Sequence, residues 1–244
     1  MIYVCSDIHG RYDRWMKLLE TINFGPEDTM YVLGDVIDRG PDGIKILLDI
    51  AARKNVHLLM GNHEYMMLVS LADVFSGKEY SRTLNVWTKP KNGGAITLAA
   101  FLDASEEEQN TVIELLQDAL VIKIIEINGQ KFHLSHSNTI DVIEKDEYKV
   151  SELSIFDLND VLWTSPFRGD ELYVPLDYYN GSYCYIVGHV PTQRINGVDT
   201  TEFVKTDTKN GCIIDIDLGC ALDDTTRNCL GCLRLDDMEE FKIE

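Results

Sequence analysis

The chain has 244 residues, 45% of them hydrophobic and 26% charged, which is enough apolar material to bury a large core. Asp and Glu number 41 against 22 Lys and Arg, so the formal net charge is −19. A surface this negative repels phosphate backbones and anionic lipid, and we therefore expect no nucleic-acid partner and no peripheral membrane binding.

Strand and helix patterns alternate over the first half of the chain. Short apolar runs predict buried strands, and apolar residues at helical spacing predict helices. The expected order is strand 2–5, helix 14–22, strand 29–33, helix 43–53, strand 56–60 and helix 64–75. A polar, irregular stretch at 76–94 precedes two further helices at 95–102 and 106–118.

Hairpins dominate the second half. Asn-Gly pairs at Asn128-Gly129 and Asn210-Gly211, each between two apolar runs, are strong hairpin signals. The runs are 121–127 with 131–134 and 202–206 with 212–217, and a closing strand is expected at 230–235. The sequence thus predicts an α/β fold, α+β-like in its second half, with mixed sheets flanked by helices in a single catalytic domain spanning 1–244.

We expect a cytoplasmic location. The N-terminus shows no charged leader before an apolar stretch, and no apolar run approaches the roughly 18–20 residues of a membrane span. Six cysteines are too few for a secreted disulfide scaffold. Cys229-x-x-Cys232 has no second pair at ligand spacing, so we interpret both as buried small apolar residues rather than a zinc or redox pair.

Polar side chains that can bind metals follow five predicted strands where each strand ends. In chain order they are Asp7 with His9, Asp35 with Asp38, Asn62 with His63, His136, and His189. The carboxyl ends of strands in open α/β sheets share one edge, so we expect these side chains to converge. His133 alternates away from His136 on its strand and is interpreted as structural.

This mixture of carboxylate, amide and imidazole suits borderline divalent metals; Mg²⁺ or Ca²⁺ alone prefers oxygen ligands, and structural zinc prefers thiolates. Too many ligands exist for one ion, which favours two cations with a shared carboxylate. Such a pair, about 3.5–4 Å apart, clamps the attacking and leaving oxygens of a phosphoryl displacement. Each motif alone could be a turn or a helix cap, but their joint occurrence at five strand ends favours the site.

These motifs resemble, in order, those of the metal-dependent phosphoprotein phosphatases, a family of calcineurin-like metallophosphoesterases, and most closely its compact bacterial and phage members. The matching stretches are Asp7-x-His9-Gly10, Gly34-Asp35-x-x-Asp38-Arg39-Gly40, Gly61-Asn62-His63-Glu64, His136 and Gly188-His189. The likeness extends to Trp87, Asn92-Gly93-Gly94 and Val161-Leu162-Trp163, and so runs through nearly the whole chain.

The resemblance implies a β-sandwich of mixed sheets with a dimetal site at the carboxyl ends of its strands. It implies two divalent ions per chain, Mn²⁺ first, with Fe or Zn also compatible. The implied ligands are Asp7 and His9 for the first ion, Asp35 as the bridge, and Asn62, His136 and His189 for the second.

The resemblance also implies the remaining roles. His63 would be the general acid, oriented by Asp38, while Arg39 and Asn62 would contact the substrate phosphate. Arg168 is the candidate second phosphate-binding arginine, although it lies five residues past Trp163 rather than at the family's spacing.

The implied reaction is hydrolysis of phosphate monoesters by direct attack of a metal-bound hydroxide, without a phosphoenzyme. The first expectation is a serine/threonine protein phosphatase, with dual specificity left open; the alternative is a symmetrical dinucleoside polyphosphate (diadenosine tetraphosphate) hydrolase on the same scaffold. Asp38 and Glu64 favour the first, because the tetraphosphatases tend to lack that Asp and carry Asp in place of Glu64. A catalytically dead phosphate-binding module would have lost ligands, and none is lost. The expected partner is a phosphorylated protein or small molecule, bound by a monomer or weak homo-oligomer.

Overall fold

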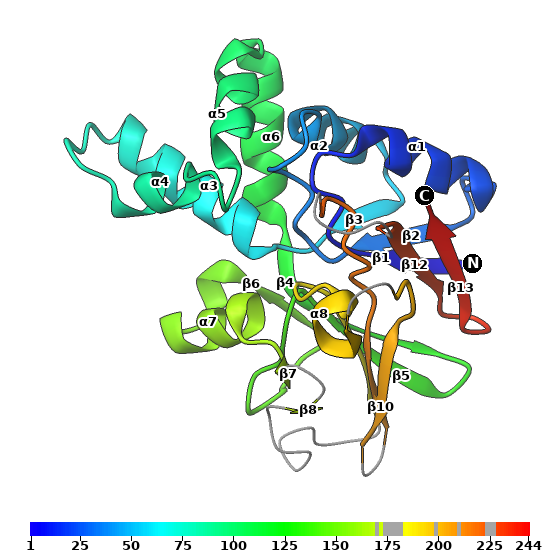
Figure 1. Ribbon diagram of the computed structural model, residues 1–244. Helices are drawn as coiled ribbons and strands as arrows, with labels where there is room; N and C mark the ends of the chain where they lie inside the picture. Colours follow the sequence, from blue (N-terminus) through cyan, green and yellow to red (C-terminus); the bar gives the residue numbers. More distant parts are fainter. Residues whose placement is uncertain (169–170, 173–182, 198–199, 209–210, 223–227) are drawn as a thin grey trace.

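Two β-sheets face each other, with helices packed on the outside of the upper one (Figure 1). The computed structural model describes residues 1–168, 171–172, 183–197, 200–208, 211–222 and 228–244, without the side chains of 168, 171 and 172. The sheets have the strand orders β13-β12-β1-β2-β3 and β10-β11-β9-β5-β4-β6. Two mixed sheets flanked by helices are the architecture that the sequence predicts.

The five-stranded sheet follows the predicted alternation of strands and helices. Its strands are β1 (Ile2–Cys5), β2 (Thr29–Val32), β3 (Val56–Leu58), β12 (Leu230–Arg234) and β13 (Glu239–Ile243). The first three are parallel and are joined by α1 (Tyr12–Thr21) and α2 (Gly43–Ala52), because parallel neighbours need a crossover. Strand β12 pairs with the other edge of β1 in antiparallel orientation. Strands from the two ends of the chain are therefore neighbours in one sheet.

The six-stranded sheet contains both predicted hairpin regions. Its strands are β4 (Leu120–Ile127), β5 (Gln130–Ser135), β6 (Glu147–Lys149), β9 (Tyr183–Val187), β10 (Val204–Asp207) and β11 (Cys212–Asp215). The β4–β5 turn has positive φ at Asn128 and Gly129, as its Asn-Gly sequence predicts. The β10–β11 pair also forms, whereas Asn210 of its turn lies outside the described residues.

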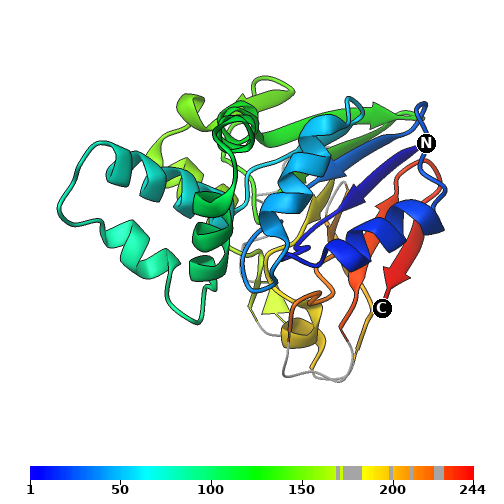
Figure 2. The same cartoon turned by 90° about the horizontal axis from the view of Figure 1, so that it is seen from above.

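Four helices follow one another at one side of the sandwich, and the last of them packs beside α2 (Figure 2). They are α3 (Asn62–Phe75), α4 (Arg82–Trp87), α5 (Gly94–Asp103) and α6 (Glu106–Asp118). The expectation of an irregular stretch at 76–94 was wrong in part, because it contains α4. Ser81 caps this helix by accepting a hydrogen bond from the Leu84 N–H, and only Trp87 of its six residues is buried, so no apolar periodicity marks it.

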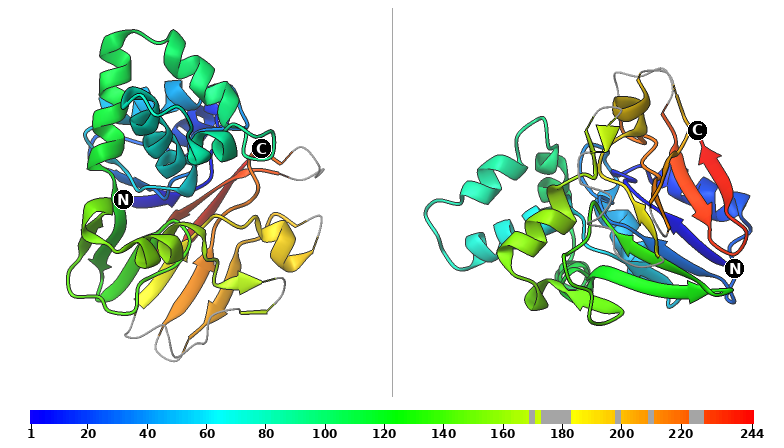
Figure 3. Two further views of the ribbon diagram at one scale, coloured as in Figure 1. Left: turned by 90° about the vertical axis from the view of Figure 1, so that its left-hand side faces the viewer. Right: turned by 90° about the horizontal axis from the view of Figure 1, so that it is seen from below.

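The remaining described elements lie beside the six-stranded sheet (Figure 3). They are η1 (Val150–Glu152), α7 (Ile155–Trp163), the short pair β7 (Phe167–Arg168) and β8 (Glu171–Leu172), and α8 (Thr192–Asn196). The sequence patterns do not single out these short segments. None of the described helices is both long and apolar enough to cross a membrane.

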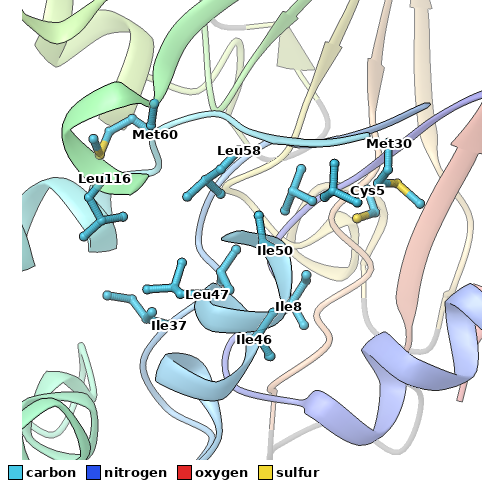
Figure 4. Packing of buried hydrophobic residues seen from close by; sticks show 14 of the residues in the cluster. Cys5, Ile8, Met30, Ile37, Ile46, Leu47, Ile50, Leu58, Met60 and Leu116 are labelled. Carbon is cyan, nitrogen blue, oxygen red and sulfur yellow. The ribbon is translucent and has the colours of Figure 1, made fainter. Parts of the chain in front are cut away.

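Two buried clusters hold the layers together. One fills the space between the sheets and includes Val4, Leu33, Leu134 and Ile186. The larger one packs α1, α2 and α6 against the five-stranded sheet, with Ile46, Leu47 and Ile50 of α2 at its centre (Figure 4). This packing fixes the sheet edge on which the polar strand ends lie.

The cysteines behave differently from one another. Cys184 and Cys212 are register partners on the parallel strands β9 and β11 and form a disulfide, a pairing the sequence spacing did not predict. Cys229 and Cys232 are buried with free thiols, in agreement with their interpretation as small apolar residues.

Candidate metal centre

The loops after β1 and β2 are bonded to each other along the carboxyl edge of the sheet. The Asp7 N–H donates to the Gly34 carbonyl at 3.1 Å, and the His9 N–H donates to the Asp35 carbonyl at 2.9 Å. Asp7, His9 and Asp35 all have positive φ, between 47° and 55°. Left-handed backbone at non-glycine residues is costly and concentrates at functional sites, which here lets three side chains turn toward one point.

Glycine allows the third loop to join them. Gly34 has φ +88°, and a Cβ there would lie 2.3 Å from the Gly61 nitrogen at the start of α3. The β2 and β3 loops therefore touch backbone to backbone, which brings Asn62 and His63 beside Asp35.

The first cluster of possible ligands contains His9, Asp35 and His63, whose ligand atoms lie within 4.8 Å of one another. His9 Nε2 lies 3.6 Å from Asp35 Oδ2 and 3.9 Å from Asp7 Oδ1. His9 Nδ1 lies 2.8 Å from the Ile37 carbonyl, which can only accept, so Nδ1 carries the proton of the neutral ring and Nε2 presents its lone pair toward the carboxylates. Asp7 Oδ1 is buried and has no hydrogen-bond partner among the described residues.

The second cluster contains Asp35, His136 and His189. Asn62 Oδ1 lies 3.0 Å from His136 Nε2 and 3.1 Å from His189 Nδ1, and these two nitrogens are 3.2 Å apart. His136 Nδ1 donates to the Leu33 carbonyl at 2.8 Å, which turns its Nε2 lone pair toward the amide oxygen. Electron-rich atoms packed this closely suit a cation between them.

Asp35 belongs to both clusters. Its Oδ2 faces His9 and His63, at 3.6 and 3.7 Å from their Nε2 atoms, whereas its Oδ1 lies 3.4 Å from His136 Nε2. One carboxylate oxygen thus points to each cluster. This is the arrangement that a ligand shared by two ions requires.

Charges in the site suit metal binding. Burial alone would raise the pKa of Asp35, but the surrounding imidazoles of His136, His63 and His9 lower it well below its usual range. Burial and the nearby His136 lower the pKa of His189 to about 3, and burial with Arg39 lowers the pKa of His9. Ionised carboxylate and neutral imidazole are the forms that bind metals, so the donor set fits two divalent cations.

His63 uses one ring nitrogen for a hydrogen bond to a residue outside the ligand clusters. Its Nδ1 lies 2.5 Å from Asp38 Oδ2, and both residues are buried. Burial would lower the pKa of His63, but the charges of Asp35 and Asp38 outweigh it and raise the pKa. Its Nε2 lies within reach of the first cluster, so His63 stands between that cluster and Asp38.

Arg39 extends from the surface to the ligands. Its Nη1 lies 2.6 Å from His9 Nε2 and its Nη2 lies 3.4 Å from His63 Nε2. A guanidinium at this point can hold a phosphate oxygen beside the first cluster. Arg168 ends β7, but its side chain lies outside the described part of the chain, as does any contact it makes.

Two buried residues of the site received no role from the sequence. Glu64 accepts backbone hydrogen bonds from the loop that carries Asp35, and Trp87 donates to Asp38. Trp87 had one signal, since it is among the residues that resemble the phosphatase family.

Comparison with known proteins agrees with this geometry. The calcineurin-like phosphoesterase family profile matches residues 1–207. The chain is 34% identical over 90 residues to a symmetrical bis(5'-nucleosyl)-tetraphosphatase of Wigglesworthia glossinidia brevipalpis, covering 36% of this chain and 33% of that protein. It is 34% identical over 91 residues to a putative serine/threonine-protein phosphatase of Caenorhabditis elegans, covering 35% of this chain and 25% of that protein. These matches span a third or less of each relative's length.

Solved structures show the same fold. A putative diadenosine tetraphosphatase superposes with a TM-score of 0.63 at 15% identity, covering 99% of this chain and 92% of that one. A serine/threonine phosphatase of Saccharomyces cerevisiae gives a TM-score of 0.56 at 16% identity, covering 100% and 79%. At such low identity the likeness concerns the fold alone.

Proposed function

The chain belongs to the calcineurin-like phosphoesterase family, and we propose that residues 1–244 form one catalytic unit that hydrolyses phosphate esters or anhydrides with two divalent cations. The observation that carries the proposal is Asp35, whose two carboxylate oxygens each face a separate ligand cluster. A single-ion site would not need a second cluster on the far side of the same carboxylate.

The proposed ligands are those of the two clusters with one change: His63 is taken as the acid, and Asp7, whose Oδ1 lies 3.9 Å from His9 Nε2, is taken as a ligand of the first ion. They are Asp7, His9 and Asp35 for one ion, and Asp35, Asn62, His136 and His189 for the other. Their nitrogen and oxygen atoms suit Mn²⁺, which we propose as the activator, and equally Fe or Zn. Bound there, such ions supply a water of lowered pKa and offset the charge of the phosphate oxygens.

The chain's own side chains would bind the phosphate and move the proton. Arg39 would hold phosphate oxygens at the rim of the clusters, with Asn62 beside it. His63 would carry a proton on Nε2 and transfer it to the leaving oxygen, and Asp38 would hold the ring through Nδ1. The raised pKa of His63 keeps that proton available near neutral pH.

The relatives favour symmetrical dinucleoside tetraphosphates as the substrate. Several of the curated proteins that resemble this chain are symmetrical tetraphosphatases, from Wigglesworthia and from Erwinia tasmaniensis among others. We therefore take this class as the first candidate, ahead of the phosphoprotein that the sequence motifs favoured.

One observation favours a phosphoserine or phosphothreonine ester as the second candidate. The His63–Asp38 pair is fully buried and short. An alkoxide is a poor leaving group that needs a proton in the transition state, whereas a nucleoside diphosphate leaves as a stabilised anion and needs it less. A strongly held acid is therefore of most use on an alkyl ester.

The deciding experiment is Mn²⁺-dependent turnover on diadenosine tetraphosphate and on a phosphothreonine peptide, side by side. Dominant ADP release supports the first candidate, and dominant peptide dephosphorylation supports the second. The Asp35→Asn variant serves as the control for contaminating phosphatases. Failure to hydrolyse either substrate, or p-nitrophenyl phosphate, with Mn²⁺, Fe²⁺ or Zn²⁺ would contradict the proposed function itself.

A further inference from the structure

Trp87 is hydrogen-bonded to the same Asp38 carboxylate oxygen as His63, the proposed general acid. Its indole Nε1–H donates to Asp38 Oδ2 at 2.7 Å, and the same oxygen lies 2.5 Å from His63 Nδ1. All three side chains are buried. They come from α4, the loop after β2 and the start of α3, so a contact over 49 residues of sequence joins α4 to the sheet edge.

The segment after Trp87 is shaped around this contact. Gly94 begins α5, and a Cβ there would lie 2.4 Å from the Trp87 Nε1 atom. Gly93 has φ +81°, and its Cβ would lie 2.6 Å from the Arg39 nitrogen. Thr97 Oγ1 accepts the Asp38 N–H at 3.0 Å. Gly93 and Thr97 therefore contact the loop that carries Asp38, and Gly94 packs against the Trp87 indole.

The hydrogen-bond donors at Asp38 determine the orientation of the His63 imidazole. An indole N–H can only donate, so Asp38 Oδ2 must accept from it. The other oxygen, Asp38 Oδ1, is buried without a hydrogen-bond partner among the described residues. Nδ1 of His63 is then the donor to a fixed acceptor, and Nε2 faces Asp35, 3.7 Å from its Oδ2.

We propose that Trp87 is a positioning residue for general-acid catalysis: it fixes the Asp38 carboxylate so that His63 presents Nε2 to the leaving oxygen. The inference rests on the proposed function, in which His63 is the acid. A Trp87 that merely fills space in the core would act on stability and leave the proton transfer unchanged.

The chain contains a matched control. Trp15 is equally buried, and its Nε1 donates to Asp49 Oδ2 at 2.7 Å, the same bond to the same kind of acceptor. Asp49, on α2, pairs with Arg53 just after the end of that helix and contacts no residue of the candidate centre among the described interactions. Trp15→Phe therefore removes an equivalent bond away from the site.

The test compares Trp87→Phe with Trp15→Phe on phenyl phosphate, a poor leaving group, and 2,4-dinitrophenyl phosphate, a good one. For Trp87→Phe we expect kcat on phenyl phosphate to fall about 10–100-fold and kcat on the dinitrophenyl ester less than about 3-fold, with KM and metal content retained. Trp15→Phe should leave the ratio of the two rates as in the wild type. Equal losses on both esters, or the same change of ratio in Trp15→Phe, would overturn the proposal.

A second readout does not depend on activity. In ¹⁵N-histidine-labelled protein at a pH high enough to remove the proton from Nε2, the neutral His63 ring should be a single tautomer protonated at Nδ1, whereas Trp87→Phe should show a mixture of tautomers. An unchanged single tautomer in Trp87→Phe overturns the role of Trp87. A wild-type protein that is inactive on both esters refutes the proposed function instead, and the tautomer readout can still be made on it. If Trp87→Phe does not fold, benzothienylalanine at position 87 keeps the bicyclic shape without the N–H donor and decides by the same two readouts.

Discussion

The carboxylate of Glu64 accepts a hydrogen bond of 2.8 Å from the backbone N–H of Asp35. The same oxygen accepts from the Gly61 N–H at 3.1 Å, and the other oxygen accepts from the N–H groups of Val36 and Ile37 at 2.8 and 3.2 Å. Glu64 is fully buried on the first turn of α3. The Glu64 side chain thus links the loop that carries Asp35 to the helix that carries Asn62 and His63.

Glu64→Gln should therefore loosen the loop at Asp35. The amide NH₂ must face one of the two pairs of N–H donors, which leaves buried donors unpaired and lowers the free energy of unfolding by about 2–4 kcal/mol. Mn²⁺ affinity should fall with it. Chemical denaturation and isothermal titration measure the two effects.

The control for this variant is Glu108→Gln. Glu108 is the third residue of α6, as Glu64 is of α3. It accepts a hydrogen bond from the Ser105 N–H, but it is exposed. We expect little change in stability or Mn²⁺ binding. If both glutamine variants behaved alike, the bonds of Glu64 to the Asp35 loop would not be what stabilises the site.

His63→Asn separates the role of acid from that of ligand. Loss of a general acid should lower kcat about 10²–10⁴-fold while both metal ions are retained. Metal content by mass spectrometry and steady-state kinetics on the same preparation give the answer. Loss of one ion in this variant would make His63 a ligand of the first cluster instead.

Asp35→Asn should deplete both ions, because one carboxylate oxygen faces each cluster. Asp7→Asn should deplete only one, since Asp7 Oδ1 faces His9, while its Oδ2 is occupied by hydrogen bonds from the Ser6 hydroxyl and the His189 backbone N–H. The measurement is metal stoichiometry after dialysis against a defined Mn²⁺ concentration. Two ions per chain in Asp35→Asn would refute the bridge.

The pH dependence of stability should contain a contribution from His133. Burial lowers the pKa of His133 to about 3, so the ring is neutral in the folded protein, whereas in the unfolded chain it protonates near pH 6.5. Protonation of the unfolded state favours unfolding. The free energy of unfolding should therefore fall below pH 6.5 by about 1.4 kcal/mol per pH unit from this residue, down to its folded pKa.

His133→Gln should remove that slope, about 2 kcal/mol between pH 6.5 and pH 5, in urea titrations of metal-free protein. His57→Gln is the comparison: His57 is exposed on β3 and its pKa is lowered by burial that is only partial, so this variant should remove a smaller slope. His9 and His189 add their own slopes in both proteins, so the comparison is with the wild type: an equally steep slope in His133→Gln would mean that His133 titrates alike in the folded and unfolded states.

The strand ends could be predicted because each depends on local sequence: an apolar run, a glycine turn and a ligand within a few residues. The side chains that hold those ligands in place could not be predicted from the sequence. Trp87 reaches Asp38 only because α4 packs beside α3, and α4 itself is too short and polar to show periodicity. Cys184 and Cys212 pair because β9 and β11 are adjacent in parallel register, which depends on the order of strands in the sheet.

The ligands of the second cluster come from both sheets. Asp35 and Asn62 follow strands of the five-stranded sheet, whereas His136 and His189 follow β5 and β9 of the other. An ion held by all four also joins the two halves of the sandwich. Its binding must then add to the cohesion of the sheets, by about 2.7 kcal/mol at a free metal concentration one hundred times Kd. Metal supply would thus govern the lifetime of the folded chain as well as its turnover.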